Sequence, residues 1–105
     1  MKLSIIVPFF NEENIIQKMY DALVAEVNKI TKAEFEIIFI NDGSKDRTFE
    51  KMLAIAEGDS RVKYISFSRN FGKEAGTIAG LEYATGEAVI LMDGDLQHPP
   101  ALIPQ

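Results

Sequence analysis

Asp93 and Asp95 are the two residues whose type and spacing most directly suggest chemistry. They flank Gly94, and the apolar run 89–92 leads straight into them, which predicts a buried strand that ends in a tight turn. Open parallel sheets bind ligands at the carboxyl ends of their strands, and carboxylate oxygens there suit Mg²⁺ or Mn²⁺ shared with a substrate phosphate. Taken alone, Asp-Gly-Asp is also an ordinary turn sequence.

Three more polar clusters follow apolar runs upstream, at 11–12, 41–44 and 69–70. Each cluster begins where a strand is predicted to end, so a parallel sheet would bring all four clusters to one edge. This convergence is the main functional signal that the residues carry by themselves.

Two roles are open for Asp42. Its carboxylate could accept hydrogen bonds from the backbone of its own turn, which is a common role for Asp. It could instead read a nucleobase. A carboxylate accepts hydrogen bonds, so it suits the N–H groups of uracil or guanine and not the acceptor nitrogens of adenine or cytosine.

Other polar side chains near the clusters are weaker candidates. Gln97 offers a further oxygen ligand, or is a solvated loop residue. Arg69 and Lys73 could neutralise phosphate, and Lys73 stands near the start of a predicted helix, where anions are favoured. His98 is the only histidine and is more typical of a surface loop, and Glu12 of the first turn of a helix.

The hydrophobic pattern predicts an α/β, Rossmann-like fold with a mostly parallel sheet and helices on both faces. Strands are predicted at 3–7, 35–40, 62–67 and 87–92, with helices at about 11–29, 44–58 and 73–85. Apolar and polar residues alternate over part of the third strand, which predicts that it lies near a sheet edge. Ser44 or Asp46 is predicted to cap the second helix. Its inner face is predicted to consist of Phe49, Met52, Leu53 and Ala56.

Local signals set the other predicted boundaries. Pro8 lacks a backbone N–H and is predicted to end the first strand. Asn11 is predicted to cap the first helix, and Gly86 to be the C′ residue of the third. Gly76 and Gly80 share one face of that third helix, which predicts close packing on the sheet.

Composition narrows the classes of protein. The chain has 105 residues, enough for one small domain, and a net charge of -5 without a basic stripe, which argues against nucleic acid as a partner. It has no cysteine, so disulfides and thiolate metal sites are excluded. Its N-terminus does not resemble a signal peptide, and no run approaches the length of a membrane span.

Four segments, at 7–12, 41–46, 68–73 and 92–100, together resemble the family 2 inverting glycosyltransferases. The resemblance is strongest to the branch of dolichyl-phosphate mannose synthase-like and bacterial polyprenyl-phosphate glycosyltransferases, and it covers the whole chain. It implies a GT-A fold, a nucleotide-sugar donor and a divalent cation. Residues 1–105 would be the nucleotide-sugar-binding N-terminal part of the domain, cut after the D-x-D motif and able at best to bind nucleotide.

The resemblance also implies roles for individual residues. Asp42 would recognise the base, Asp93 would lie by the ribose and phosphates, and Asp95 with Gln97 would bind the metal ion, Mg²⁺ or Mn²⁺. The full set of implied nucleotide-binding residues is Pro8, Phe10, Glu12, Asp42, Asn70, Lys73, Asp93 and Gly94. The branch often has an acidic residue in place of His98 and Ala in place of Gly94, which leaves the roles of the two metal ligands intact.

The implied reaction transfers a sugar from a UDP- or GDP-sugar to a polyprenyl-phosphate acceptor, with inversion at the anomeric carbon. Such an acceptor is already anionic at pH 7 and needs little help from a base. No general base is evident in these 105 residues. The intact protein is expected at the cytoplasmic face of a membrane, with membrane contact through later residues. A second copy of the protein is a further candidate partner, in a homo-oligomer.

Three other classes of protein also have a parallel α/β domain or a D-x-D motif. A Rossmann dehydrogenase is disfavoured because the first strand leads into Pro-Phe-Phe-Asn-Glu and not into a Gly-x-Gly-x-x-Gly turn. A phosphatase using Asp93-Gly94-Asp95 is less favoured because the motif follows the fourth strand and the first strand ends without an Asp. A non-catalytic nucleotide-binding domain remains the main alternative.

Overall fold

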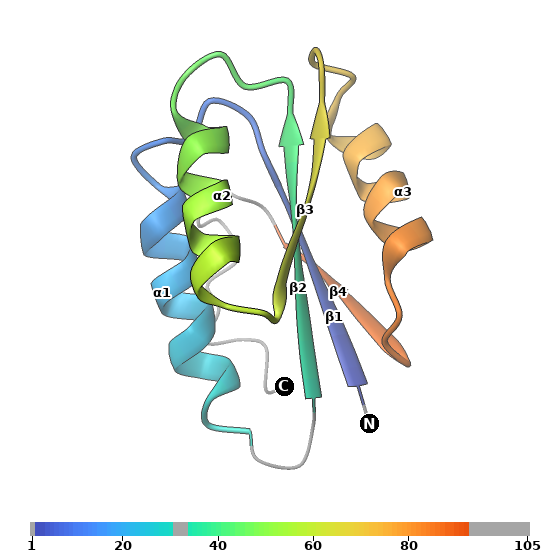
Figure 1. Ribbon diagram of the computed structural model, residues 1–105. Coiled ribbons are helices and arrows are strands. Elements are labelled where there is room, and N and C mark those ends of the chain that lie inside the picture. Colours follow the sequence, from blue (N-terminus) through green and yellow to red (C-terminus); the bar gives the residue numbers. More distant parts are fainter. Residues whose placement is uncertain (1, 31–33, 93–105) are drawn as a thin grey trace.

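Strands and helices alternate along the chain, and the computed structural model describes residues 2–30 and 34–92 (Figure 1). The strands are β1 (Lys2–Phe9), β2 (Glu34–Asp42), β3 (Val62–Phe67) and β4 (Ala88–Leu91). The helices are α1 (Ile16–Val27), α2 (Thr48–Gly58) and α3 (Lys73–Tyr83). The pairs in this sheet are parallel and the strand order is β3-β2-β1-β4, which confirms the predicted α/β fold and the edge position of β3.

Helices cover both faces of the sheet, with α1 and α2 on one side and α3 on the other (Figure 1). The central strands β1 and β2 are therefore apolar on both sides. Ile5 and Phe39 belong to the core shared with α1 and α2, whereas Ile6 and Ile40 belong to the smaller core on the side of α3. Burying each such side chain stabilises the fold by about 1.5–3 kcal/mol. None of the described helices has the length and apolar character needed to cross a bilayer.

The two glycines of α3 let this helix approach the sheet closely. A Cβ atom on Gly80 would lie 2.6 Å from Cγ2 of Ile6, and one on Gly76 would lie 3.1 Å from Cγ2 of Ile40. Both distances leave little or no room for a side chain. The predicted close packing of α3 on β1 and β2 is therefore confirmed.

Pro8 lies inside β1, so the prediction that it ends the strand is wrong. Met92 N donates to Ile6 O at 3.0 Å, which shows that even-numbered residues of β1 turn their backbone groups toward β4. The missing N–H of Pro8 therefore faces the side on which β4 ends at Leu91, paired with Ile6. Within the described ladder the proline removes no hydrogen bond, and β1 continues through it.

Asn11 does not cap α1, contrary to the prediction. Its φ is 52°, and the helix begins only at Ile16. Between them, Glu12 O accepts hydrogen bonds from Ile15 N and Ile16 N and forms the turn that leads into the helix. The buried face of α1 is Ile16, Met19, Leu23 and Val27.

The second helix also differs in detail from its prediction. Its N-cap position is Arg47 and not Ser44 or Asp46, although Asp46 Oδ1 accepts a hydrogen bond from Thr48 N at 2.9 Å. Leu53, predicted to face inward, is 37% exposed. The fully inward positions of this helix are Thr48, Met52 and Ile55.

The third helix ends two positions earlier than predicted, at Tyr83, and Ala84 is already extended. Gly86 is therefore not its C′ residue. Gly86 instead lies against β1, where a Cβ atom would be 2.7 Å from Ser4 N.

Candidate functional site

The loops after β1, β2 and β3 meet at the carboxyl edge of the sheet, at the top of Figure 1. The loops after β1 and β2 are joined by hydrogen bonds. Asn11 N donates to Ser44 Oγ at 3.0 Å, and Lys45 N donates to Asn11 Oδ1 at 2.8 Å. Asn11 adopts its left-handed conformation to make both contacts, and Asn tolerates that conformation better than most residues.

The same two loops are joined again at the start of α2. Glu12 N donates to Thr48 Oγ1 at 2.8 Å, and Glu13 N donates to Asp46 Oδ2 at 3.2 Å. Burial raises the pKa of Asp46, but the hydrogen bonds from Thr48 and from Glu13 N outweigh it and hold that pKa below its ordinary value. Asp46 is therefore a charged acceptor that stabilises the loops.

Asp42 lies at the carboxyl end of β2 and is 3% exposed. Its Oδ1 accepts a hydrogen bond from Phe71 N at 2.8 Å, and its Oδ2 accepts one from Gly72 N at 3.0 Å. These amides belong to the loop before α3 and not to the turn of Asp42 itself, where its mundane role was expected. A carboxylate has about four acceptor positions, so base recognition by Asp42 stays a prediction that these two bonds do not exclude.

Gly43 allows that loop to lie directly on the end of β2. Its φ is 71°, and a Cβ atom at this position would lie 2.2 Å from Arg69 C and 2.3 Å from Asn70 N. Any side chain would therefore collide with backbone and strain the turn. The loop 68–72 is held by this close approach and by the two bonds to Asp42.

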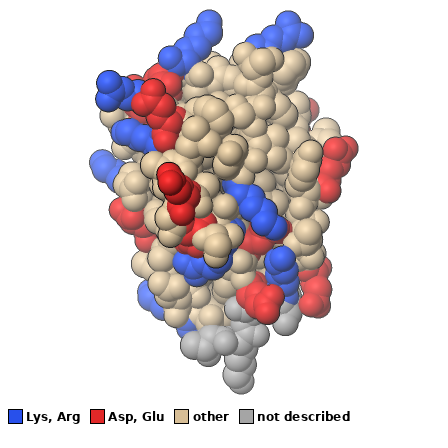
Figure 2. Space-filling model, viewed as in Figure 1, with Lys and Arg blue, Asp and Glu red and all other residues tan. Residues whose placement is uncertain are grey.

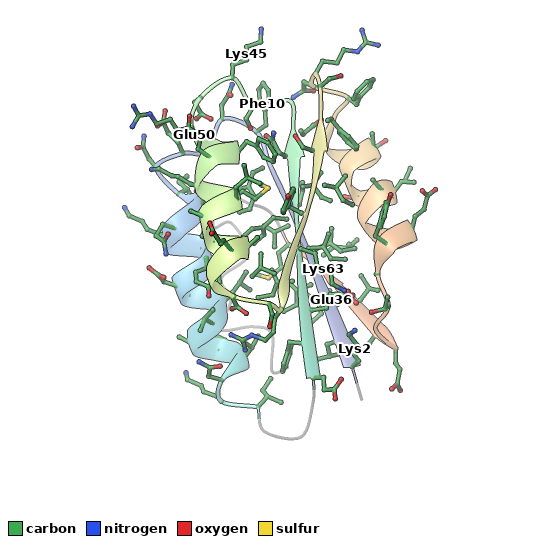
Figure 3. The ribbon with its side chains drawn as sticks, in the orientation of Figure 1. Lys2, Phe10, Glu36, Lys45, Glu50 and Lys63 are labelled. Atoms are coloured by element: carbon green, nitrogen blue, oxygen red, sulfur yellow. The ribbon has the colours of Figure 1, made fainter. Side chains whose placement is uncertain are left out.

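Aromatic rings and cations are exposed at this edge. Phe71 is 51% exposed and packs edge-on against Phe67, with 5.5 Å between the ring centroids. The guanidinium carbon of Arg69 lies over the Phe71 ring, 4.8 Å from its centroid. Phe10 is 42% exposed in the loop after β1, and Lys45 projects from the loop after β2 at the same end of the sheet (Figure 3). Lys and Arg side chains project at this end of the molecule (Figure 2). Rings that can stack on a base, together with positive charge, suit a nucleotide ligand.

Six of the predicted site residues lie on segments that reach this edge. Pro8 and Phe10 are at the end of β1 and just beyond it, and Glu12 is half-buried in the next turn. Asp42 ends β2, whereas Asn70 is exposed in the loop before α3. The sixth is Lys73, which begins α3. The other four predicted residues, Asp93, Gly94, Asp95 and Gln97, lie outside the described residues.

The predicted metal ligands are oxygen donors. Across residues 2–30 and 34–92, the structure contains no group of three or more acidic or His side chains arranged to hold a metal ion. The predicted ligands Asp95 and Gln97 lie outside those ranges and would supply a carboxylate and an amide oxygen. Such hard oxygen donors fit Mg²⁺ or Mn²⁺.

Sequence patterns did not predict the contacts that join the loops at this edge. Asn11 and Ser44 are 33 residues apart, and Asp42 and Phe71 are 29 apart. The only local hint was the concentration of Asn, Asp and Ser after each strand, which indicates polar turns without identifying their partners.

Comparison with known proteins gives relatives over nearly the whole chain. It is 52% identical over 101 residues to "Putative glycosyltransferase CsbB" of Bacillus subtilis, covering 96% of this chain and 30% of that protein. It is 50% identical over 105 residues to "Bactoprenol glucosyl transferase" of Shigella phage SfX, covering 100% of this chain and 34% of that protein. The chain thus spans about a third of the length of these relatives.

Solved glycosyltransferase structures share the fold. The Staphylococcus aureus TarS 1-349 structure in complex with UDP matches with a TM-score of 0.77 and 29% identity, over 90% of this chain and 28% of TarS 1-349. The mannosyltransferase PcManGT from Pyrobaculum calidifontis, in complex with GDP-Man and Mn²⁺, matches with a TM-score of 0.74 and 25% identity, over 89% of this chain and 27% of PcManGT.

A family model described as "Glycosyl transferase family 2" matches residues 4–105. This match favours a glycosyltransferase over the dehydrogenase and phosphatase alternatives. The Rossmann-like parallel sheet agrees with the solved glycosyltransferases of GT-A fold. By its sequence and by its fold, the chain belongs to glycosyl transferase family 2.

Proposed function

We propose that the intact protein transfers a sugar from a UDP- or GDP-sugar to a polyprenyl-phosphate carrier, with inversion at the anomeric carbon and with a divalent cation. The observation that carries this proposal is 50% identity, over all 105 residues, to a protein named bactoprenol glucosyl transferase. Structural neighbours in complex with UDP and with GDP-Man and Mn²⁺ support a nucleotide-sugar donor.

The carboxyl edge of the sheet is the proposed donor site. Phe10 and Phe71 are exposed there and can pack against the nucleoside, with Pro8 and Glu12 lining the same loop. Asp42 would read the base through its remaining acceptor capacity while it holds the loop that carries Asn70. Lys73, at the start of α3, would favour the anionic phosphates.

The cation would be held by Asp95 and Gln97, with Asp93 and Gly94 close to the ribose and phosphates. When bound, it would offset the negative charge that grows on the departing nucleoside diphosphate. An acceptor phosphate oxygen would attack the anomeric carbon as the bond to the diphosphate breaks. Because that oxygen is already anionic, the proposed reaction needs little help from a general base.

The acceptor and the cellular place of the protein follow from the same proposal. A polyprenyl phosphate is anchored in a membrane, so the enzyme would work at the cytoplasmic face, where nucleotide sugars are available. These 105 residues would form the N-terminal, donor-binding part of the domain. In the intact protein, we assign acceptor binding and membrane contact to other residues.

Calorimetry on the full-length protein tests the donor site. We expect UDP or GDP to bind in the presence of Mn²⁺ and ADP and CDP to bind much more weakly, because Asp42 suits bases that donate N–H groups. Asp95→Ala should abolish the effect of Mn²⁺, and Asp42→Ala should weaken binding by about tenfold, the size expected for a lost hydrogen bond to a charged group. Asp21→Ala is the matched control, since Asp21 is exposed on α1.

Equal binding of all four nucleotides, or binding that Mn²⁺ does not change, would contradict the proposed donor site. A non-catalytic nucleotide-binding domain would show the same selectivity for UDP or GDP but no transfer. Incubation with a radiolabelled UDP- or GDP-sugar and polyprenyl phosphate separates the two, because only a transferase moves the label into the lipid fraction.

A further inference from the structure

Glu36 is an acidic residue within the otherwise apolar centre of β2, and its side chain is 2% exposed. It lies on the face covered by α3, toward the amino end of the sheet and away from the proposed donor site (Figure 3). Burying a carboxylate is costly unless it is well paired. Its partners therefore indicate what the residue does.

The carboxylate of Glu36 binds the turn between α3 and β4. Its Oε2 accepts hydrogen bonds from Thr85 N at 2.9 Å and from Ser4 Oγ at 2.6 Å. Ser4 Oγ in turn accepts a hydrogen bond from Gly86 N at 2.9 Å. Lys63, on β3, completes the cluster by an ion pair with Oε1. A single side chain of β2 thus links β1, β3 and the turn that precedes β4.

The turn is also held by a close approach. A Cβ atom on Gly86 would lie 2.6 Å from Ser4 Oγ and 2.9 Å from Lys2 O. Immediately afterwards, Glu87 N donates to Lys2 O at 2.7 Å, which starts the ladder between β1 and β4. The position of Thr85 and Gly86 therefore decides which residue of β4 first pairs with β1.

Hydrophobic burial alone defines the register of β4 only weakly. The segment 88–92 is apolar at every position, so both of its faces carry apolar side chains. Val89 and Leu91 are 38% and 51% exposed on one face, whereas Ile90 is partly buried and Met92 is 5% exposed on the other. A slip by one residue would exchange one apolar set for the other, a change that hydrophobicity penalises little.

We propose that Glu36 is a positioning residue that fixes the register of β4 on β1 through its bonds to Thr85 and Ser4. A slip by one residue would move β4 by about 3.3 Å and turn each side chain to the opposite face. Asp93 follows Met92 directly in the sequence, which connects the register of β4 to the proposed ligand-binding segment. The consequence for ligand binding rests on the proposed donor site.

The experiment compares Glu36→Gln with Lys63→Met in the full-length protein by hydrogen–deuterium exchange. Lys63→Met removes the ion pair but leaves the bonds of Glu36 to the turn. Because loss of the Glu36 charge also lowers the stability of the whole fold, a peptide covering 37–40 serves as the measure of that general effect. We expect Glu36→Gln to speed exchange in a peptide covering 87–92 by about tenfold more than in 37–40, as expected when a hydrogen bond to a charged group is lost. In Lys63→Met, exchange in 87–92 should not rise beyond exchange in 37–40.

Ser4→Ala is the second variant, because it removes the hydroxyl that joins Glu36 to Gly86 without removing the buried charge. It should speed exchange in 87–92 as well. The inference is overturned if 87–92 stays protected in Glu36→Gln and Ser4→Ala, or if Lys63→Met speeds its exchange to the same extent. General destabilisation alone would speed exchange in 37–40 and in 87–92 to the same extent, and that result also overturns the inference.

Nucleotide affinity supplies the functional readout. If wild-type protein binds UDP or GDP with Mn²⁺, Glu36→Gln should weaken that binding, because a smaller fraction of the protein has β4 in the binding-competent register, whereas Lys63→Met should not. If wild-type protein binds neither nucleotide, the proposed donor site fails, and the exchange pattern of β4 still decides the role of Glu36.

Discussion

Glu36 shows how far the environment of one residue changes its chemistry. Burial raises the pKa of its carboxyl group, but hydrogen bonds from Lys63, Ser4 and Thr85 N outweigh burial and lower the pKa to about 2 from an ordinary 4.5. The group is therefore charged in the folded protein at any pH near neutrality. Because its pKa is lower in the folded than in the unfolded state, it stabilises the fold above pH 4.5.

This stabilisation should disappear in acid. As the pH falls from 4.5 toward 2, the unfolded state takes up a proton before the folded state does, and the contribution of Glu36 is lost. Glu36→Gln should therefore lower the free energy of unfolding by roughly 3 kcal/mol at pH 7 and by much less near pH 2. Urea titrations of both proteins at several pH values measure this difference.

Asp59 also has a pKa lowered to about 2. The hydrogen bond from Arg61 lowers this pKa most, burial raises it, and the hydrogen bond from Tyr20 lowers it further. The contribution of Asp59 to stability is lost as the pH falls from 3.8 toward 2, a window that overlaps that of Glu36. Asp59 contributes equally in both proteins, so its effect cancels in the difference between their free energies of unfolding. A difference that stays constant from pH 7 to pH 2 would show that Glu36 does not keep its charge in the folded state.

Helix α3 is the element whose position depends most on small residues. Its contacts with the sheet run through Gly76 and Gly80, and the nearest atoms to a Cβ on Gly80 belong to Ile6, which is fully buried between β2 and β4. A larger residue cannot enter without moving Ile6 or lifting the helix. Close packing here therefore outweighs the preference of helices for Ala over Gly.

Gly80→Ala should lower the free energy of unfolding by about 1–3 kcal/mol, the usual cost of overpacking a core. Gly58→Ala is the matched control, since Gly58 is also helical, in α2, and a Cβ there meets nothing within 4 Å. That change should be neutral or stabilising by up to about 1 kcal/mol. Thermal or urea unfolding compares them, and equal effects of the two substitutions would refute the packing of α3.

At the scale of the whole molecule, the parallel sheet gathers loops from three strands at one edge. The loops after β1 and β2 are joined by side-chain hydrogen bonds, and the loop after β3 is held by Asp42. A ligand at this edge would contact segments that come together only in the folded state. Its binding should therefore stabilise the whole fold and not one loop alone.

UDP or GDP with Mn²⁺ should accordingly raise the melting temperature of the full-length protein. At a ligand concentration of 100 times Kd, the expected stabilisation is about 2.7 kcal/mol. Differential scanning fluorimetry across a nucleotide series measures it, with ADP and CDP as controls. An equal rise with every nucleotide would point to a bound ion or to nonspecific phosphate binding.

The order of the elements was predictable because each strand and helix carries its own hydrophobic pattern. The run 62–67 matched β3 at both ends, and partial alternation correctly placed it at a sheet edge. Boundaries were less predictable where a residue's local preference met a tertiary constraint. Pro8 stays in β1 because its missing N–H removes no bond from the described ladder, and Asn11 leaves the helix start to bind the loop after β2.

The fold class, the family and the edge at which polar residues gather could be predicted from the sequence, since these depend on periodicity and on motifs that are local in the chain. The partners of Asp42 and Glu36 became visible in the folded molecule alone. Asp42 binds amides 29 and 30 residues away, and Glu36 binds Thr85, 49 residues away. Such pairs depend on which strands are neighbours and on where α3 crosses the sheet, and no local pattern encodes either.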